Sequence, residues 1–131
     1  MEIQKEYEIF LQNVLDSQEI YILQNSEGLA CQNGEEHKGA MCILIWGQAL
    51  KAEEQRQGEF ESLEVDSISL YEFLFRWLPN MEEEGVFCSI NWCEENGGLE
   101  IEPDELRTHL KSVLPDELKN AYKVRLEAEV S

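Results

Sequence analysis

SLYEFLFRWLPNMEEEGVFCSINWCEENGGLEIEPDELRTHLKSVL, from Ser69 to Leu114, carries the clearest structural pattern in the chain. It predicts a capped apolar helix, a short acidic turn, a buried strand, a loop rich in asparagine and glycine, and a second capped helix. These local patterns agree with one another, as they do in a sequence that specifies one compact fold. None of them is a catalytic or ligand-binding signature, so the stretch indicates architecture and not activity.

The helix over 69–78 is predicted by its N-terminal cap and its apolar face. Ser69 and Glu72 have the spacing of a capping box. The apolar residues after the cap fall on one face of a helix, namely Leu70, Phe73, Leu74, Trp77 and Leu78. Pro79 is expected to end or bend this helix, and an acidic turn closed by Gly85 is expected to follow.

Four further helices are predicted besides the one over 69–78. In the N-terminal segment, apolar residues recur with a helical period at Ile3, Tyr7, Phe10, Leu11 and Val14. Residues 48–57 are rich in good helix formers and predict a surface helix. Proline followed by acidic residues opens each of the last two predicted helices, over 103–113 and 116–128.

Short apolar or alternating runs predict the strands. They cover residues 19–23, 29–32, 40–46, 59–66, 86–92 and 99–102. The run 40–46 is apolar throughout, which is typical of a central strand buried on both faces. No linker divides the chain, so we predict one α+β domain over residues 1–131. In it, a mixed or antiparallel sheet of about five or six strands packs with about five helices.

The acidic balance of the chain is its strongest compositional feature. The 131 residues include 28 acidic and 10 basic side chains, for a net charge of −18. This charge favours a basic protein partner and disfavours direct binding to nucleic acid or to an anionic membrane. Alternatively, it serves only solubility. Homo-oligomer formation stays open.

The location of the protein is predicted from two further features of the sequence. No run approaches the roughly 18 apolar residues of a membrane span, and the first residues do not resemble a signal peptide. We therefore expect a cytoplasmic protein. Its cysteines are expected to be reduced, as is usual in that compartment.

The cysteines and histidines offer little sign of catalysis or metal binding. The cysteines lie at positions 31, 42, 88 and 93. Four residues separate Cys88 from Cys93, the upper end of the usual spacing of a zinc ligand pair, whereas ten separate Cys31 from Cys42. Cys42 and Cys88 fall within apolar runs, which favours ordinary buried thiols. A nucleophilic centre would need a histidine beside a cysteine, and neither His37 nor His109 lies in a recognisable motif. We predict no cofactor and no metal.

Acidic pairs and one tryptophan are the remaining candidates for a functional surface. The carboxylates group at 82–84, at 94–95 and at Glu100 with Glu102, and paired carboxylates can serve glycoside hydrolysis or bind a divalent cation. Here they are expected in turns and loops, where water solvates them. Trp92 shares strand parity with Ile90, which favours the core, or else it is an exposed anchor for a partner. The candidate partner-binding residues are Glu82, Glu83, Glu84, Trp92, Glu94 and Glu95.

Several short motifs give the chain a family resemblance. They are the Leu-x-x-Phe-Leu helix, Trp77-Leu78-Pro79, Gly85-Val86, Asn91-Trp92 and Glu102-Pro103-x-Glu105-Leu106. With these motifs, residues 3–114 resemble a family of small bacterial proteins catalogued only as a domain of unknown function. The chain is similar, more distantly, to the enhanced-serine-sensitivity (SseB) type of domain, in which an apolar strand ends near Trp46. The resemblance implies an α+β fold and no activity, and residues 115–131 are expected to form an added helix.

These features together favour a non-catalytic cytoplasmic protein-interaction domain whose acidic loops bind a basic partner. A concrete version is an immunity or antidote protein against a nuclease-type toxin, because nucleic-acid enzymes carry basic clefts that an acidic protein can block. One alternative is a small carboxylate-dependent enzyme or divalent-cation-binding protein. Another is a DNA-mimic inhibitor, which would need carboxylates in rows at phosphate-like spacing.

Overall fold

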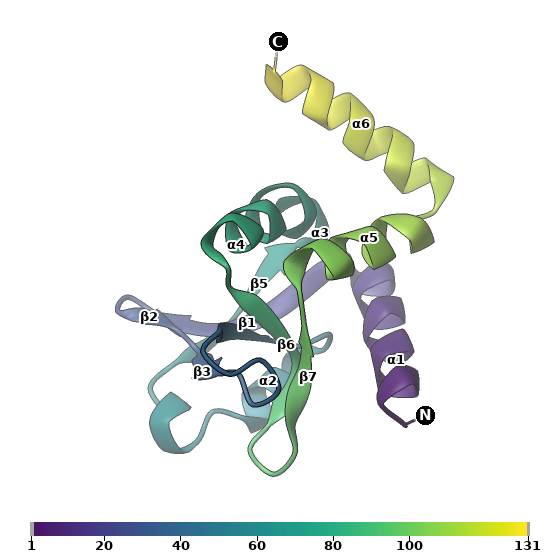
Figure 1. Cartoon of the computed structure of the whole chain (residues 1–131). Coiled ribbons are helices and arrows are strands. Elements are labelled where there is room, and N and C mark those ends of the chain that lie inside the picture. Colours follow the sequence, from purple (N-terminus) through teal and green to yellow (C-terminus); the bar gives the residue numbers. More distant parts are fainter. Residues whose placement is uncertain (1, 131) are drawn as a thin grey trace.

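The computed structural model describes the backbone of residues 2–130 and the side chains of residues 5–130 (Figure 1). Ile3, which was predicted on the apolar face of the first helix, therefore lies outside the described side chains. The α-helices are α1 (Glu2–Ser17), α2 (Ala49–Glu54), α3 (Leu70–Glu72), α4 (Leu78–Glu84), α5 (Pro103–Val113) and α6 (Asp116–Val130). A 3₁₀ turn, η1 (Gly58–Phe60), follows α2, and a π-helical segment, η2 (Phe73–Trp77), joins α3 to α4. The strands are β1 (Glu19–Asn25), β2 (Gly28–Leu29), β3 (Cys31–Asn33), β4 (Met41–Ile45), β5 (Glu64–Ser69), β6 (Phe87–Cys93) and β7 (Gly97–Ile101).

The strands confirm the α+β class but divide into two sheets. Within the described residues, β2-β1-β5 form an antiparallel sheet, and β3-β4-β6-β7 form a mixed sheet in which β4 and β6 are parallel. The prediction of one sheet was wrong because the predicted strand 29–32 changes sheets at Ala30. The Ala30 N–H donates to Leu23 of β1, and its carbonyl accepts from Leu44 of β4. An isolated bridge between Tyr21 of β1 and Trp46, the residue after β4, also links the sheets.

The helix predicted over 69–78 continues beyond Pro79 to Glu84. The Ser69 half of its predicted capping box is confirmed, since the Ser69 hydroxyl accepts from the Glu72 N–H at 3.1 Å. The Glu72 carboxylate pairs with Arg76 at 3.3 Å. Pro79 lies in the first turn of α4, directly after the π-helical segment, where its missing N–H and fixed φ are tolerated. The helix ends at Gly85, which has a φ of +72°. The acidic residues 82–84 therefore lie in the last turn of a helix and not in the predicted loop.

The segment between α2 and β5 also differs from its prediction. The surface helix predicted over 48–57 ends at Glu54, and the strand predicted over 59–66 begins only at Glu64. Phe60 and Leu63 are both buried. Their spacing of three fits a single helical turn and not a strand, because strand residues three apart point to opposite faces.

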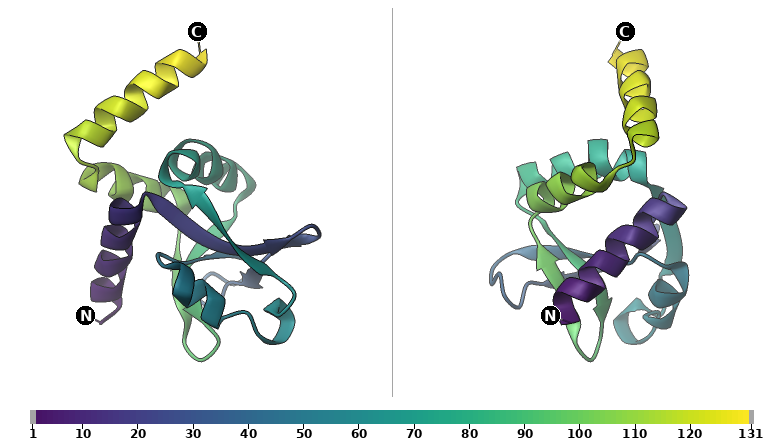
Figure 2. Two further views of the ribbon diagram at one scale, coloured as in Figure 1. Left: turned by 180° about the vertical axis from the view of Figure 1, so that it is seen from behind. Right: turned by 90° about the vertical axis from the view of Figure 1, so that its right-hand side faces the viewer.

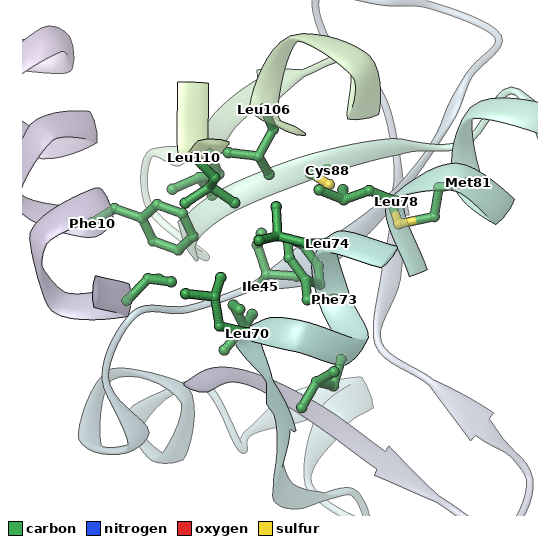
Figure 3. Close-up of a cluster of buried hydrophobic side chains, with 14 of the residues drawn as sticks. Phe10, Ile45, Leu70, Phe73, Leu74, Leu78, Met81, Cys88, Leu106 and Leu110 are labelled. Atoms are coloured by element: carbon green, nitrogen blue, oxygen red, sulfur yellow. The ribbon is translucent and has the colours of Figure 1, made fainter. Parts of the chain in front are cut away.

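Helices α1, α3–α4 and α5 cover the main apolar core, which Figure 3 shows in close-up. The predicted helical stripe supplies Leu70, Phe73, Leu74 and Leu78, all fully buried. Phe10 and Val14 of α1 pack against this core from one side, and α5 contributes Leu106 and Leu110. A second, smaller apolar cluster lies under α2 and η1 and consists of Leu23, Ala30, Leu44, Trp46, Ala52, Phe60 and Leu63.

The C-terminal helices match their predicted positions, and α6 leans away from the sheets (Figure 2). Its first half docks on the helical layer through Tyr122, whose ring meets that of Tyr71 edge-on at 5.3 Å. The Arg125 guanidinium stacks 3.8 Å from the centre of the Tyr71 ring. Arg76 then pairs with Glu129 at 3.0 Å. The added helix over 115–131 therefore contacts its own domain.

Within residues 2–130, no helix combines the length and the apolar content that crossing a bilayer would require.

Truncation of the helical stripe should destabilise the whole domain. Leu74→Ala removes a fully buried side chain from the main core, so we expect the free energy of unfolding to fall by about 2–5 kcal/mol. Leu50→Ala on α2 is the matched control, because Leu50 is 72% exposed and should change stability by less than about 0.5 kcal/mol. Urea unfolding followed by circular dichroism measures both, and equal losses would contradict the assigned core.

Candidate functional site

The excess negative charge is concentrated in the first 102 residues. They contain 22 acidic and five basic side chains, a net charge of −17, whereas residues 103–131 contribute only −1. The structure therefore separates an acidic body of strands and helices from a nearly neutral pair of C-terminal helices. A basic partner would be attracted to that body.

The predicted partner-binding residues divide into two groups at opposite ends of β6 (Figure 1). Residues 82–84 lie on the last turn of α4, before β6 begins. Glu94 and Glu95 lie in the turn of the β6–β7 hairpin, after β6 ends. A seven-residue strand separates the two groups, a span of about 20 Å. They cannot form one contact surface of a small binding site.

The α4 group is partly neutralised within the molecule. Arg107 of α5 reaches Glu82 at 3.2 Å and also Asp104 at 3.0 Å. Glu83 and Glu84 are exposed beside it. This group lies over packed helices, so it offers charge but no cavity.

The hairpin end, in contrast, borders two adjoining cavities. The first, of about 480 Å³, lies between the hairpin, strand β3 and the segment 55–60. The second, of about 610 Å³, lies between the hairpin, α1, α2 and the end of β4. Trp92, Gln55 and Glu35 line both cavities. Of the predicted residues, the structure thus places Trp92 and Glu94 at a cavity, with Glu95 next to them in the turn.

A bulge in β6 positions Trp92. The pairing of β6 with β7 shifts between Ile90 and Cys93, and Asn91 takes a φ of +52°. Two hydrogen bonds hold this bulge against the end of β4. The Trp46 indole N–H donates to the Trp92 carbonyl at 2.8 Å, and the Asn91 side-chain oxygen accepts from the Gly47 N–H at 3.2 Å.

The sequence left open whether Trp92 belongs to the core or is an exposed anchor, and the structure gives it features of both. Its side chain is half-buried and packs edge-on against Phe60, with ring centres 5.6 Å apart. It also lines both cavities. Strand parity could not show this, because the bulge breaks the alternation on which parity depends.

Ser89 and Gly98 shape the wall of the first cavity. Ser89 is a buried polar residue, 3% exposed, and it lines this cavity. Gly98 faces it from β7, and a Cβ there would collide with the Ser89 hydroxyl and stand 2.9 Å from the Ile90 carbonyl oxygen. The sequence predicted only a loop rich in asparagine and glycine here, whereas Gly98 lies in β7 and is required for close approach of the two strands.

Glu100 holds the loop that forms one side of both cavities, a role that sequence reasoning missed. Its carboxylate accepts the backbone N–H groups of Glu35, Glu36 and His37 at 2.7–3.2 Å. Nδ1 of His37 also lies 3.2 Å from Oε1. Burial alone would raise the pKa of Glu100, but the backbone and histidine hydrogen bonds outweigh it and lower this pKa. The residue is therefore structural, whereas its predicted companion Glu102 is exposed.

The other carboxylates at the first cavity have no basic partner. In the described part of the chain, the salt bridges do not include Glu35, Glu59 or Glu94. Gln32 donates a side-chain hydrogen bond to Glu59. Among the described residues that line either cavity, Lys51 is the one basic side chain, and it lies in the second. The first cavity is therefore suited to a cationic ligand and not to an anionic one.

Three of the four cysteines, at positions 31, 42 and 88, lack the lowered pKa of a reactive thiol. Burial raises the pKa of Cys31, of Cys88 and of Cys42, the last to about 11. Catalytic thiols need the opposite shift. The histidines are engaged elsewhere, His37 with Glu100 and His109 with the Tyr7 hydroxyl at 2.6 Å. Among the side chains of residues 5–130, no three histidine, cysteine or acidic groups converge as a metal site would require.

Comparison with known proteins gives one match. The family model described as "Protein of unknown function (DUF2750)" matches residues 7–110. This range contains all seven strands of the described residues and every residue that lines the first cavity, and it ends before α6. Of the residues that line the second cavity, Glu6 alone lies outside it. No curated protein and no solved structure matches the chain.

The hydrogen bonds between Glu100 and the 35–37 loop should make the stability of the protein depend on pH. Glu100→Gln replaces one carboxylate oxygen with an N–H₂ that cannot accept the backbone N–H groups, so we expect a loss of about 1–3 kcal/mol near neutral pH. Because the pKa of Glu100 is lower in the folded than in the unfolded chain, its stabilisation is complete above the ordinary value near 4.5 and disappears as pH falls through the folded pKa. The difference between the wild type and Glu100→Gln should therefore shrink in acid.

Urea unfolding at several pH values measures this difference. Glu36→Gln is the control, because it removes one charge from the same loop at an exposed side chain. A difference in unfolding free energy that does not change with pH, or an equal loss in the control, would exclude this role of Glu100.

The close approach at Gly98 predicts a second sensitive position. In Gly98→Ala, the new methyl group must displace Ser89 or the β6 backbone, so we expect destabilisation of about 1–3 kcal/mol and a shifted Trp92 indole signal in NMR spectra. Gly28→Ala is the control, since a Cβ at Gly28 meets nothing within 4 Å. If both variants kept wild-type stability and spectra, the close approach of Gly98 to Ser89 would be contradicted.

Proposed function

We propose, from the premise that the chain belongs to the DUF2750 family of proteins of unknown function, that it is a non-catalytic protein-interaction domain. Its partner is a basic protein, which it binds at the hairpin end of the molecule. The observation that carries this proposal is the group of carboxylates without basic partners beside a half-buried tryptophan. The residues of this hairpin surface are Glu35, Glu59, Trp92, Glu94 and Glu95.

Electrostatics support a basic partner over other classes of ligand. The hairpin surface belongs to the part of the chain that carries −17 of the −18 net charge. Such a field speeds association with cationic proteins and opposes nucleic acid or anionic lipid. The C-terminal helices are nearly neutral, so the attraction is directed to one part of the molecule and is not uniform.

Trp92 supports a protein interface within that field. Tryptophan is enriched at the energetic centres of interfaces, where acidic or polar residues around it complete the contact. Here the bulge and the Trp46 hydrogen bond fix the backbone of Trp92 before any partner arrives. A fixed anchor costs less conformational entropy on binding than a mobile one.

The concrete form of the proposal is an immunity or antidote protein that acts in the cytoplasm. A nuclease-type toxin presents a basic cleft for the phosphate backbone, and an acidic domain can occupy that cleft. The distant similarity to the SseB type of domain stays a prediction and adds no activity to this proposal.

A small carboxylate-dependent enzyme or cation-binding protein is the second candidate. One observation favours it: the first cavity has a volume of about 480 Å³, within the range of small-ligand sites. A DNA mimic would instead require rows of carboxylates. The two acidic groups at opposite ends of β6 do not supply such rows.

Capture of a partner from the native host at increasing salt tests the proposal. We expect a stoichiometric basic protein whose binding weakens steeply between low and physiological salt. Glu94→Lys with Glu95→Lys should reduce its association about tenfold or more, because it reverses charge at the hairpin surface. Glu83→Lys with Glu84→Lys is the matched control at the α4 end and should have a much smaller effect.

Three results would count against the hairpin surface. They are a captured protein that is not basic, binding that does not respond to salt, and an equal loss in both double variants. A rise in melting temperature of several degrees with calcium or magnesium would favour the second candidate instead.

A further inference from the structure

The first cavity is a pocket with defined walls and not a flat acidic patch. Its volume is about 480 Å³. Strand β6 contributes Ser89 and Trp92 to its wall, and Phe60 of η1 contributes an apolar edge. Gln32 and Gln55 bring side-chain amides from two other segments. Aromatic, amide and carboxylate groups from four parts of the chain therefore surround one space.

The charges around this space have one sign. Four carboxylates line it, and one of them, Glu100, is already saturated by hydrogen bonds from the 35–37 backbone. Glu35, Glu59 and Glu94 remain. Among the residues described as lining this cavity there is no lysine, arginine or histidine. A positive group placed here would meet up to three carboxylates and no competing cation.

The uncharged groups of the cavity suit a planar cation. An indole ring such as that of Trp92 attracts a cation over its face, and arginine uses this contact more often than lysine. A guanidinium is also planar, stacks on aromatic rings and donates to carboxylates in pairs. The buried Ser89 lies in the same wall, where its hydroxyl can accept a further N–H.

The pocket is held in shape by contacts within the protein. The Glu94 N–H donates to the Gln55 side-chain oxygen at 3.2 Å, which ties the hairpin turn to the segment after α2. Gln32 of β3 donates to Glu59. Gly98 allows β7 to approach Ser89 closely. These contacts position the walls in the unbound chain, so binding need not assemble them.

We propose that this cavity is a receptor pocket for the guanidinium of one arginine side chain, presented by the basic protein partner. The guanidinium stacks on Trp92 and donates to Glu59 and Glu94. This inference rests on the proposed function, since it names the group by which a basic partner is recognised. It assigns no chemical step to the site.

Titration with N-acetyl-arginine amide tests the pocket without any knowledge of the partner. Signals of the Trp92 indole N–H and the Ser89 amide, followed by NMR, should shift and saturate at millimolar concentration. N-acetyl-citrulline amide has the same shape but no charge, and it should bind about tenfold more weakly or not at all. Trp92→Leu should abolish the response of the Ser89 amide while the protein stays folded.

A pair of matched double variants separates the pocket from the general charge. Glu59→Gln with Glu94→Gln removes two carboxylates from the cavity and should weaken binding of N-acetyl-arginine amide about tenfold. Glu83→Gln with Glu84→Gln makes the same change of net charge at the α4 end and should alter it less than about twofold. Thermal melting of all variants confirms that they are folded.

The pocket is overturned if no signal saturates, if the citrulline amide binds as tightly as the arginine amide, or if both double variants lose affinity equally. Loss of the pocket and loss of the proposed function are distinguishable. If a basic partner is still captured in a salt-sensitive manner while the arginine amide does not bind, only the pocket fails. If the arginine amide binds at the cavity but no basic protein is captured, the pocket stands and the interaction proposal fails.

Discussion

The end of strand β4, at Trp46 and Gly47, is the point on which the rest of the structure depends. The Trp46 backbone bonds to Tyr21 in both directions at 2.9 Å, and this bridge connects the two sheets. Its indole N–H and the Gly47 N–H hold the β6 bulge at 91–92. Helix α1 is positioned here too, because a Cβ at Gly47 would stand 3.2 Å from the Phe10 ring. The sheets, the first helix and the hairpin therefore meet at two consecutive residues.

The same junction explains where the cavities lie. Strands β4 and β6 are parallel, and their carboxyl ends meet beside Trp46 and Trp92. In parallel sheets, ligands commonly bind outside the carboxyl ends of the strands, where the chain leaves the sheet. Here the bulge and the hairpin extend past that edge, and α2 and the 35–37 loop close the sides. A mixed sheet of four strands thus creates a hollow end opposite its helix-covered end.

Charge is distributed to match this division. At the helical end, arginines of η2, α5 and α6 neutralise acidic neighbours, as in the contacts of Arg76, Arg107 and Arg125. These exposed pairs contribute little stability individually, and they offset part of the negative charge of that surface. At the hairpin end, Glu100 is satisfied by backbone N–H groups. Glu35, Glu59 and Glu94, which line the same cavity, form no salt bridge among the described residues.

The amino-acid sequence by itself determined the α+β class, the capped stripe that begins at Ser69 and the two C-terminal helices, because each depends on contacts within a few residues. It also indicated Trp92 and Glu94 as candidates, from an aromatic residue beside an acidic turn. Only the tertiary structure decided that the strand at Ala30 changes sheets, that Glu100 serves the 35–37 loop and that residues 82–84 lie far from the hairpin. Each of these depends on groups distant in sequence, such as His37 and Glu100, which are 63 positions apart. Local spacing carries no information about which distant backbone groups will meet, because packing of the whole chain selects those partners.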